Sequence, residues 1–389
     1  MSPMKDQTIV CFAKDWNEDP TSCNHVLGGL SETNKVVWIN SIASRAPNLT
    51  SGRDLKKIAN RLKYLFNNTK QVGDQMWLLT PAVLPFNHIP AVIKLNKFLL
   101  TTQVNTLLKK ISAKKFQLWT FFPLPLDYID TLNGELFVYY CTDNWSKFSA
   151  MNSQTGNMVE NLAKRADLVF ATSNTLVEKL KGFNEETHLA SHGVSYDLFA
   201  TALEDSTPIP DDMKDIPGPR LGFYGLIEDW MDQNLVSYLA ERHPEWSIVL
   251  IGKSLVDTSK LEKYPNIHFL GRKPHDQLAA YCKGFDVGLI PHQVNELTLH
   301  MNPIKLREYL SAGLPIVSTA LPEMRNFPDS CVVAESYEEF EAGIKKFLQD
   351  TPEERRKRSK TMAEETWDHK VARIGSTIET VRRKKQLTN

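Results

Sequence analysis

Short apolar runs alternate with helix-like segments along most of the chain, and this alternation constrains the fold more than any other feature. The first two runs, at residues 8–13 and 35–40, have the spacing of a β-α-β unit. Such alternation predicts a parallel, doubly wound sheet covered by helices. Further strands are predicted at residues 76–79, 116–121, 136–140 and 168–171, and helices at 55–66, 91–111, 158–165 and 175–181.

A polar segment then interrupts the pattern at residues 200–219. It contains four prolines, which is typical of a linker between domains. The alternation restarts at residue 220, so the fold class predicted is α/β with two Rossmann-like domains. The predicted organisation is an N-terminal domain (1–199), a hinge (200–219), a C-terminal domain (220–365), and a terminal helix with a basic tail (366–389).

The charge of the chain is balanced overall but unevenly distributed. Lys plus Arg (46) equals Asp plus Glu (46), which argues against a nucleic-acid-binding protein. Residues 52–116 nevertheless contain twelve basic and two acidic residues, a net charge of +10. Two predicted helices there mix bases with large apolar side chains, which predicts docking on an anionic membrane surface. The alternative is that these are ordinary solvated faces whose apolar residues pack on the sheet. The apolar residues are Leu62, Tyr64, Leu65 and Phe66 in one helix, and Phe98, Leu99 and Leu100 in the other.

The cysteines and the N-terminus predict a cytoplasmic location. The five cysteines are odd in number and widely spaced, which disfavours a disulfide framework or a zinc site. Residues 1–8 lack the pattern of a signal peptide. The uncharged run at 75–93 contains three prolines and is better explained as strand plus loop than as a membrane span.

The strongest local motif is the segment 302–318, NPIKLREYLSAGLPIVS. Pro303 suits the first position of a helix, and Gly313 suits the residue just after its end. Free N–H groups at the helix start attract anions. Lys305 and Glu308 share one face of this helix, where they would bind a diphosphate and a ribose diol. The alternative is an ordinary solvated Lys–Glu pair.

This segment resembles the donor site of GT-B glycosyltransferases, in particular a bacterial polysaccharide branch similar to the teichuronic acid biosynthesis glycosyltransferases. The resemblance covers residues 136–330 well and the first 130 residues weakly. Other matching phrases are LGFYGLIEDWMD (221–232), PEWSIVLIG (244–252), NIHFLGRKP (266–274), FDVGLIP (285–291), LFVYYCTDNW (136–145), ADLVFATS (166–173) and SHGVSYDLF (191–199).

The resemblance implies a nucleotide-sugar site in the C-terminal domain. Beside Lys305 and Glu308, it places Asn302, Pro303, Ile304 and Gly225 at the donor. Many retaining relatives carry a Glu eight residues before the position of Glu308, but this chain has His300 there, with Glu296 four residues earlier. This departure favours an inverting reaction. Arg272, Lys273 and Lys253 follow strand ends and would border the base or phosphates, unless they are ordinary exposed charges.

Asp143 is the predicted catalytic base. It follows the strand at 136–140, and ligands of doubly wound domains meet the carboxyl ends of strands. A carboxylate there would take the proton of an acceptor hydroxyl. The alternative is a helix cap or turn former. Asp15 and Asp19, after the first strand, compete for the role, and His192 is a further acceptor-side candidate unless it is structural.

The expected function is therefore transfer of a sugar from a nucleotide-sugar to a hydroxyl acceptor, with no metal and no cofactor. UDP is favoured by the resemblance, and GDP stays open. The acceptor expected is a glycan or a lipid-linked saccharide at the inner face of the plasma membrane. The alternatives are a nucleotide-sugar 2-epimerase and a catalytically inactive nucleotide-sugar-binding partner, which the His300 departure keeps open.

Overall fold

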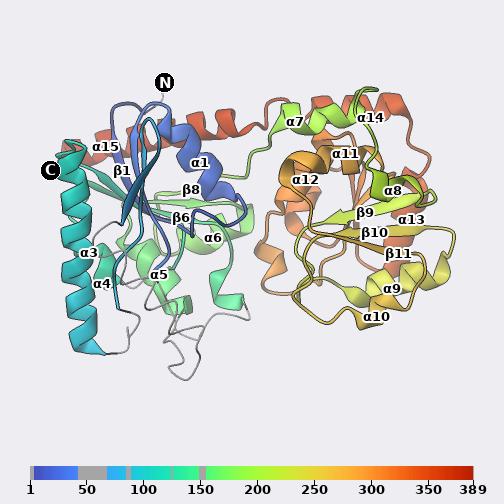
Figure 1. Cartoon of the computed structure of the whole chain (residues 1–389), viewed down its shortest axis with the longest axis horizontal. Coiled ribbons are helices and arrows are strands. Elements are labelled where there is room, and N and C mark those ends of the chain that lie inside the picture. Colours follow the sequence, from blue (N-terminus) through green and yellow to red (C-terminus); the bar gives the residue numbers. More distant parts are fainter. Residues whose placement is uncertain (1–3, 43–67, 85–88, 124–125, 149–154, 389) are drawn as a thin grey trace. The chain divides into compact units, whose positions relative to one another are not determined.

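The computed structural model describes residues 4–42, 68–84, 89–123, 126–148 and 155–388 (Figure 1). The chain divides into two units. Unit 1 comprises residues 1–191 and 370–389, and unit 2 comprises residues 192–369. The segment expected to be a hinge, 200–219, thus lies inside unit 2, and the basic C-terminal tail belongs to unit 1. The predicted helix at 55–66 lies outside the described residues.

Unit 1 is built on a sheet that has eight strands in its described part, in the order β3-β4-β2-β1-β5-β6-β7-β8. Its strands pair in parallel except for β3, which pairs antiparallel with β4 and was not expected from the sequence. The strands are β1 (Thr8–Phe12), β2 (Lys35–Ile39), β3 (Thr69–Gly73), β4 (Met76–Leu79), β5 (Gln117–Thr120), β6 (Leu136–Cys141), β7 (Leu168–Ala171) and β8 (Thr187–Leu189).

Helices cover both faces of this sheet. The core on one face joins strand residues such as Val10 and Tyr139 to Val104 of α3 and Leu180 of α6. On the other side, Gly29 of α1 lies against Val371 of the C-terminal helix α15. Lys385 of α15 donates to Asp167 at 2.7 Å, which helps to hold the tail on unit 1. The helices are α1 (Ser22–Ser31), α3 (Pro90–Lys110), α4 (Leu126–Ile129), α5 (Thr155–Arg165), α6 (Asn174–Lys181) and α15 (Trp367–Thr388).

Unit 2 is built on a parallel sheet of six strands in the order β11-β10-β9-β12-β13-β14. Alternate residues of β9 face opposite cores: Phe223 packs on one side and Tyr224 on the other, as expected for a strand between two helical layers. The strands are β9 (Arg220–Tyr224), β10 (Ser247–Ile251), β11 (Ile267–Gly271), β12 (Val287–Ile290), β13 (Ile316–Thr319) and β14 (Cys331–Ala334).

The helices of unit 2 include α12, which carries the donor motif and agrees with the sequence prediction. Pro303 directly precedes it, and Gly313 follows with φ +77°. The helices are α7 (Tyr196–Ala200), α8 (Asp211–Lys214), α9 (Gln233–Arg242), α10 (Ser259–Glu262), α11 (Leu278–Lys283), α12 (Ile304–Ser311), α13 (Tyr337–Phe347) and α14 (Pro352–Lys360).

Each sheet has one point where the strand order reverses. In unit 1, β1 pairs with β2 on one side and β5 on the other. In unit 2, β9 pairs with β10 on one side and β12 on the other. Open α/β sheets bind ligands beyond the carboxyl ends of the strands at such a point. These two strand edges are therefore where the candidate site residues must be sought.

Candidate active site

Two glycine turns make close contact beyond the carboxyl ends of β9 and β10. Gly225 has φ +135° and Gly252 has φ +143°, a region that favours glycine. The Gly225 N–H donates to the Ile251 carbonyl at 2.8 Å, and a Cβ at position 252 would lie 1.8 Å from the Gly225 oxygen. The two turns leave no room for side chains, so backbone lies open beside the reversal point of the sheet.

Lys305, in the first turn of α12, lies directly against the first of these turns. A Cβ at position 225 would lie 2.7 Å from the Lys305 Nζ. This ammonium group lies 5.3 Å from the centre of the Phe223 ring and forms no hydrogen bond or ion pair with the described residues. Burial lowers the pKa of Lys305, while nearby Glu308 opposes that shift. The arrangement is a partly desolvated cation next to exposed backbone.

Glu308 is buried, with 4% of its surface exposed, so the alternative of a solvated Lys–Glu pair is wrong. Its Oε2 accepts a hydrogen bond from the Tyr224 hydroxyl at 2.8 Å, and its Oε1 contacts Nε2 of His275 at 2.8 Å. The contact with Glu308 raises the pKa of His275. Each carboxylate oxygen keeps a second lone pair. Glu308 is thus held by two neighbours and still able to accept further hydrogen bonds.

Three residues near this cluster were not predicted from the sequence as site residues: Tyr224, His275 and His292. His292 lies two residues beyond β12 and is 2% exposed, and neither ring nitrogen has a hydrogen-bond partner among the described residues. Burial, with a smaller effect of Lys305, lowers its pKa to about 3. Its position just after the strand phrase FDVGLIP was a signal that could have identified it.

The remaining motif residues support the start of α12. Asn302 is buried, and its Oδ1 accepts from Nη1 of Arg307 at 2.9 Å. Pro303 is the N-cap, and Ile304 begins the helix. His300 contacts the Glu296 carbonyl through Nδ1 at 2.9 Å, within one loop. The side chain of Asn302 thus supports the motif from within, and the donor-binding roles of all five residues stay predictions.

The three predicted basic residues at neighbouring strand ends differ in their contacts. Lys273 is engaged by Asp212 at 2.5 Å, which also accepts from the Tyr281 hydroxyl, so its ammonium group has an internal partner. Lys253 is exposed and follows Gly252. Arg272 is exposed as well and has its own contacts. Of the three, Lys253 is best placed to reach a ligand at the glycine turns.

In unit 1, Asp143 lies just beyond the carboxyl end of β6. Its backbone carbonyl accepts from the Trp145 N–H at 2.9 Å. Burial raises the pKa of the Asp143 carboxyl group to about 7, against the opposing effect of a hydrogen bond with Thr142. Asn144, not Asp143, is the N-cap of the following short helix, Trp145–Lys147. The helix-cap alternative for Asp143 is therefore wrong.

The other acceptor-side candidates have different surroundings. Asp15 is exposed, and its Oδ1 accepts from both the N–H (3.0 Å) and the hydroxyl (2.7 Å) of Ser41. The backbone carbonyl of exposed Asp19 accepts from Lys14. His192 is buried beside Trp367, with 6.3 Å between the ring centres. Burial shifts the pKa of Asp143 into the range useful for a base, which favours this residue.

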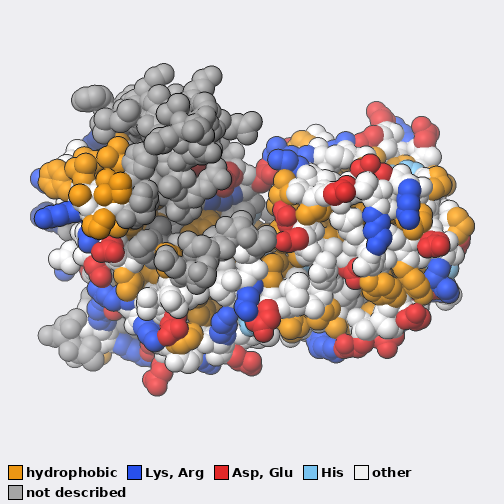
Figure 2. Space-filling model, turned by 90° about the horizontal axis from the view of Figure 1, so that it is seen from below, with side chains coloured by type: hydrophobic (Ala, Val, Ile, Leu, Met, Phe, Trp, Pro, Cys, Tyr) orange, Lys and Arg blue, Asp and Glu red, His pale blue; other side chains and the backbone are white. Residues whose placement is uncertain are grey.

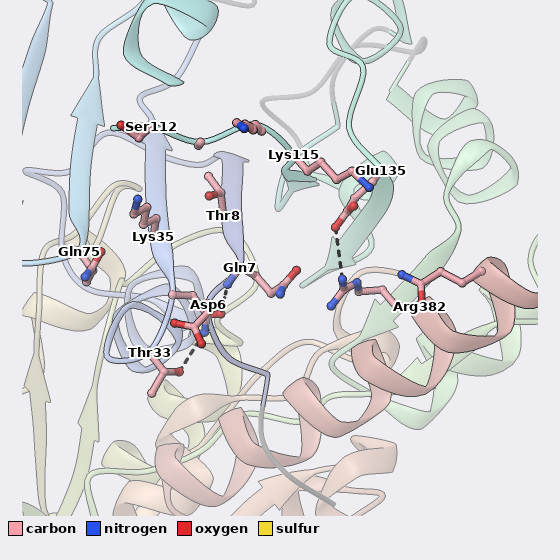
Figure 3. Close-up of a pocket in the computed structure, with 14 residues that line it drawn as sticks. Asp6, Gln7, Thr8, Thr33, Lys35, Gln75, Ser112, Lys115, Glu135 and Arg382 are labelled. Carbon is pink, nitrogen blue, oxygen red and sulfur yellow. Dashed lines mark hydrogen bonds and ion pairs between the residues drawn. The ribbon is translucent and has the colours of Figure 1, made fainter. Parts of the chain in front are cut away.

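A cavity of about 560 Å³ lies at the opposite edge of the unit 1 sheet (Figure 3). It is lined by residues at the amino ends of strands, including Thr8 of β1 and Lys35 of β2, and by Arg382 of α15, which lies 3.6 Å from Glu135. The predicted site residues are at the carboxyl ends, so this cavity is separate from them.

Comparison with known proteins bears on this geometry. Residues 231–376 match the family described as glycosyl transferase-like. The matched segment includes α12 with Lys305 and Glu308, and also His275 and His292. The teichuronic acid biosynthesis glycosyltransferase TuaH of Bacillus subtilis is 26% identical over 224 residues, which is 53% of this chain and 55% of that protein. The match thus spans about half the length of this relative.

Solved structures show the fold in which this matched segment lies. Sucrose-phosphate synthase from Thermosynechococcus elongatus has a TM-score of 0.67 and 13% identity, covering 96% of this chain and 99% of that one. The E. coli trehalose-6-phosphate protein bound with UDP-2-fluoro glucose has a TM-score of 0.64 and 11% sequence identity. The match covers 97% of this chain and 99% of that one. HepE of Anabaena, in complex with UDP, has a TM-score of 0.55 and 14% sequence identity. The match covers 98% of this chain and 99% of that one. The predicted resemblance and the GT-B fold class of two Rossmann-like domains are confirmed.

Proposed function

We propose that this protein is a glycosyltransferase that moves a sugar from a UDP-sugar to a hydroxyl acceptor. The observation that carries the proposal is the cluster of Lys305, Gly225 and Glu308 at the reversal point of the unit 2 sheet, of which Lys305 and Glu308 lie in the segment that matches the glycosyl transferase-like family. UDP in the solved structures of HepE and the E. coli trehalose-6-phosphate protein supports the choice of nucleotide.

Each member of the cluster has a role in binding the donor. Lys305 and the first N–H groups of α12 bind the diphosphate, and Glu308 accepts the ribose hydroxyls. When the sugar leaves, negative charge grows on the diphosphate, and the same groups stabilise it without a metal ion. Asn302, Pro303 and Ile304 fix the helix start, while Lys253 and Arg272 border the phosphates or base.

Asp143 is the proposed general base of an inverting reaction. Its carboxylate takes the proton of the acceptor hydroxyl as that oxygen bonds to the anomeric carbon and the bond to the diphosphate breaks. The raised pKa of Asp143, about 7, matches this task near neutral pH. A trehalose-6-phosphate synthase of similar fold is described as transferring with retention, at 13% identity. The configuration of the product therefore needs its own test.

The acceptor we propose is a lipid-linked saccharide or growing polysaccharide at an anionic membrane surface. Among the described residues, no helix is long and apolar enough to cross a membrane. Helix α3 contains no acidic residue and exposes Phe98 (67%) and Leu95 (44%) beside exposed Lys94. Figure 2 shows hydrophobic and basic side chains together on the side of unit 1 where α3 lies in Figure 1.

The residues exposed on this surface differ in part from those predicted from the sequence. Leu100 is buried in the core of unit 1, so Phe98 is the main apolar residue that α3 exposes. Leu62, Tyr64, Leu65 and Phe66 lie outside the described residues. The proposed location is the cytoplasmic face of the membrane, with Phe98 and Leu95 entering the interface and the lysines contacting anionic headgroups.

The test of the proposed activity is incubation of the protein with radiolabelled UDP- and GDP-sugars, alone and with membrane extract as acceptor. We expect slow release of UDP from one UDP-sugar, and transfer of label to a lipid-soluble or polymeric product. Interconversion of the sugar at C2 would instead identify an epimerase. Nucleotide binding without turnover would identify an inactive binding protein. An NMR spectrum of the product shows whether the anomeric configuration is inverted, as proposed, or retained.

A further inference from the structure

His292 is fixed rigidly at the carboxyl end of β12, the strand that pairs with β9 at the reversal point of the unit 2 sheet. Its backbone forms a bridge with Met231, and its carbonyl accepts from the Thr319 hydroxyl at 2.7 Å. The flanking residues are tied as well: the Asp232 N–H donates to the Pro291 carbonyl, and the Gln293 N–H donates to the Trp230 carbonyl, each at 2.8 Å. The backbone that carries the imidazole therefore has one defined position.

Within the part of the chain that the structure describes, the two ring nitrogens of this buried imidazole have no hydrogen-bond partner. Buried polar groups are nearly always paired, because an unpaired one loses its hydration without compensation. The pKa of His292, lowered to about 3 chiefly by burial, keeps the ring neutral under physiological conditions. A neutral imidazole offers one N–H donor and one acceptor nitrogen. The group thus suits a partner that both accepts and donates.

His292 and Lys305 lie against the same aromatic side chain. The ring centres of His292 and Phe223 are 6.5 Å apart with planes at 75°, and the Lys305 ammonium lies 5.3 Å from the Phe223 ring centre. Two polar groups without hydrogen bonds to the described residues are therefore neighbours at one strand edge. Lys305, a cation, suits a phosphate; the neutral imidazole suits a different part of the same ligand.

We infer that His292 hydrogen-bonds a hydroxyl group of the sugar that is transferred, an assignment that rests on the proposed donor site. The sugar is bonded directly to the diphosphate that Lys305 holds, whereas the ribose on the other side is assigned to Glu308. A sugar hydroxyl can pair with either nitrogen of a neutral imidazole, accepting from the N–H or donating to the other nitrogen, while a phosphate could use only the N–H. His292 is thus a specificity-determining residue, which selects donors by the position of a hydroxyl.

Two variants and a calorimetric titration test this inference. His292→Phe fills the same space without nitrogens, and His292→Gln keeps a donor and an acceptor. The probes are UDP, UDP-glucose, UDP-galactose, UDP-N-acetylglucosamine and UDP-glucuronic acid. In the unchanged protein, we expect one UDP-sugar to bind at least ~10-fold better than the weakest. His292→Phe should abolish this discrimination and leave UDP affinity within about twofold, and His292→Gln should retain part of it.

The outcomes separate the inference from the proposed function. Unchanged discrimination in His292→Phe would make the residue structural and overturn the inference. An equal loss of UDP and UDP-sugar affinity would assign the imidazole to the diphosphate and overturn it too. If the unchanged protein bound neither UDP nor a UDP-sugar, the proposed function itself would fail. A melting temperature of ligand-free His292→Phe at or above that of the unchanged protein confirms that the variant folds, as expected on removal of two unpaired nitrogens.

Discussion

The two units share one architecture but differ in what lies at the carboxyl ends of their strands. In unit 2, the reversal point brings together a cation, a buried carboxylate and an unpaired imidazole around two glycine turns. In unit 1, the strand ends carry aromatic residues, such as Phe122 and Trp145 with ring centres 5.2 Å apart, and the carboxyl group of Asp143, whose pKa is raised by burial. This difference fits the division of roles proposed above. The charged and polar groups of unit 2 suit tight binding of a charged nucleotide. The strand ends of unit 1 suit proton transfer near an apolar or sugar-ring surface.

The largest effect expected from this division is on turnover in Asp143→Asn. The variant keeps the shape of the side chain but loses the base, so transfer should fall by ~100-fold or more. Calorimetry should show the same UDP affinity as in the unchanged protein, because donor binding belongs to unit 2. Asp15→Asn is the matched control and should change turnover by less than about threefold. If Asp15→Asn had the larger effect, the base would be on the first loop instead.

The pH dependence of turnover tests the same residue. The carboxylate is the active form of a base, and the pKa of Asp143 is raised to about 7. Turnover should therefore rise with pH up to about 7 and level off above it, by about tenfold between pH 6 and the plateau. A profile that is already flat from pH 5 would contradict this assignment of the base.

A smaller effect, about 5- to 20-fold in UDP affinity, is expected from the residues that hold Glu308. Tyr224→Phe removes one hydrogen bond to this buried carboxylate, and His275→Gln weakens the other. Glu308→Gln should weaken UDP binding at least as much, because it also removes the charge that accepts the ribose hydroxyls. Calorimetry with uridine should show the same ranking. Equal UDP affinity in all three variants would remove Glu308 from the donor site.

The tie between His275 and Glu308 was beyond what the sequence could predict. Lys305, Glu308 and Gly313 were identifiable because their positions relative to one helix follow from local spacing. The partners of Glu308 lie 33 and 84 residues away in the chain, and only the packing of the sheet brings them together. The unpaired state of His292 is likewise a property of tertiary packing.

The fold, like the site, was predicted where the signal is local and missed where it depends on long-range packing. The alternating pattern identified both sheets, since buried parallel strands are continuous apolar runs. It missed the two edge strands of unit 1: β3, whose sequence TKQVG is polar, and β8, which has only three residues. It also assigned the C-terminal tail to a separate segment, although Lys384 and Lys385 pair with Glu186 and Asp167 of unit 1. Such long-range ion pairs leave no local signal.

The membrane surface proposed for unit 1 should give a weaker, salt-dependent effect. Phe98→Ser together with Leu95→Ser should reduce co-sedimentation with anionic vesicles by about fivefold, since less apolar area enters the interface. Leu255→Ser, at a residue of unit 2 that is 48% exposed, is the matched control and should have no effect. Added salt should release the unchanged protein. No binding to anionic vesicles at low salt would favour a soluble glycan acceptor.

The smallest effect expected is on the stability of unit 1. Because the pKa of Asp143 is raised in the folded state, folding favours its protonated form. The stability of the unchanged protein should therefore fall as pH rises from about 4 through about 7. Asp143→Asn carries no such penalty, so at pH 8 its melting temperature should be about 2–3 °C higher, and the gap should narrow at pH 5. A gap that does not change with pH would contradict burial of this carboxyl group.

Lys305 is central to the donor site proposed for unit 2, because it is the group that would bind the donor diphosphate. The decisive measurement is a calorimetric titration of UDP into the unchanged protein, Lys305→Ala and the control Lys346→Ala. We predict one UDP per chain and a loss of roughly 2–3 kcal/mol of binding free energy in Lys305→Ala, because a charge-assisted contact with the diphosphate is removed. Lys346→Ala, which changes an exposed lysine in the last turn of α13, should lose less than ~1 kcal/mol. Equal UDP affinity in Lys305→Ala and the unchanged protein would contradict the donor site proposed for unit 2.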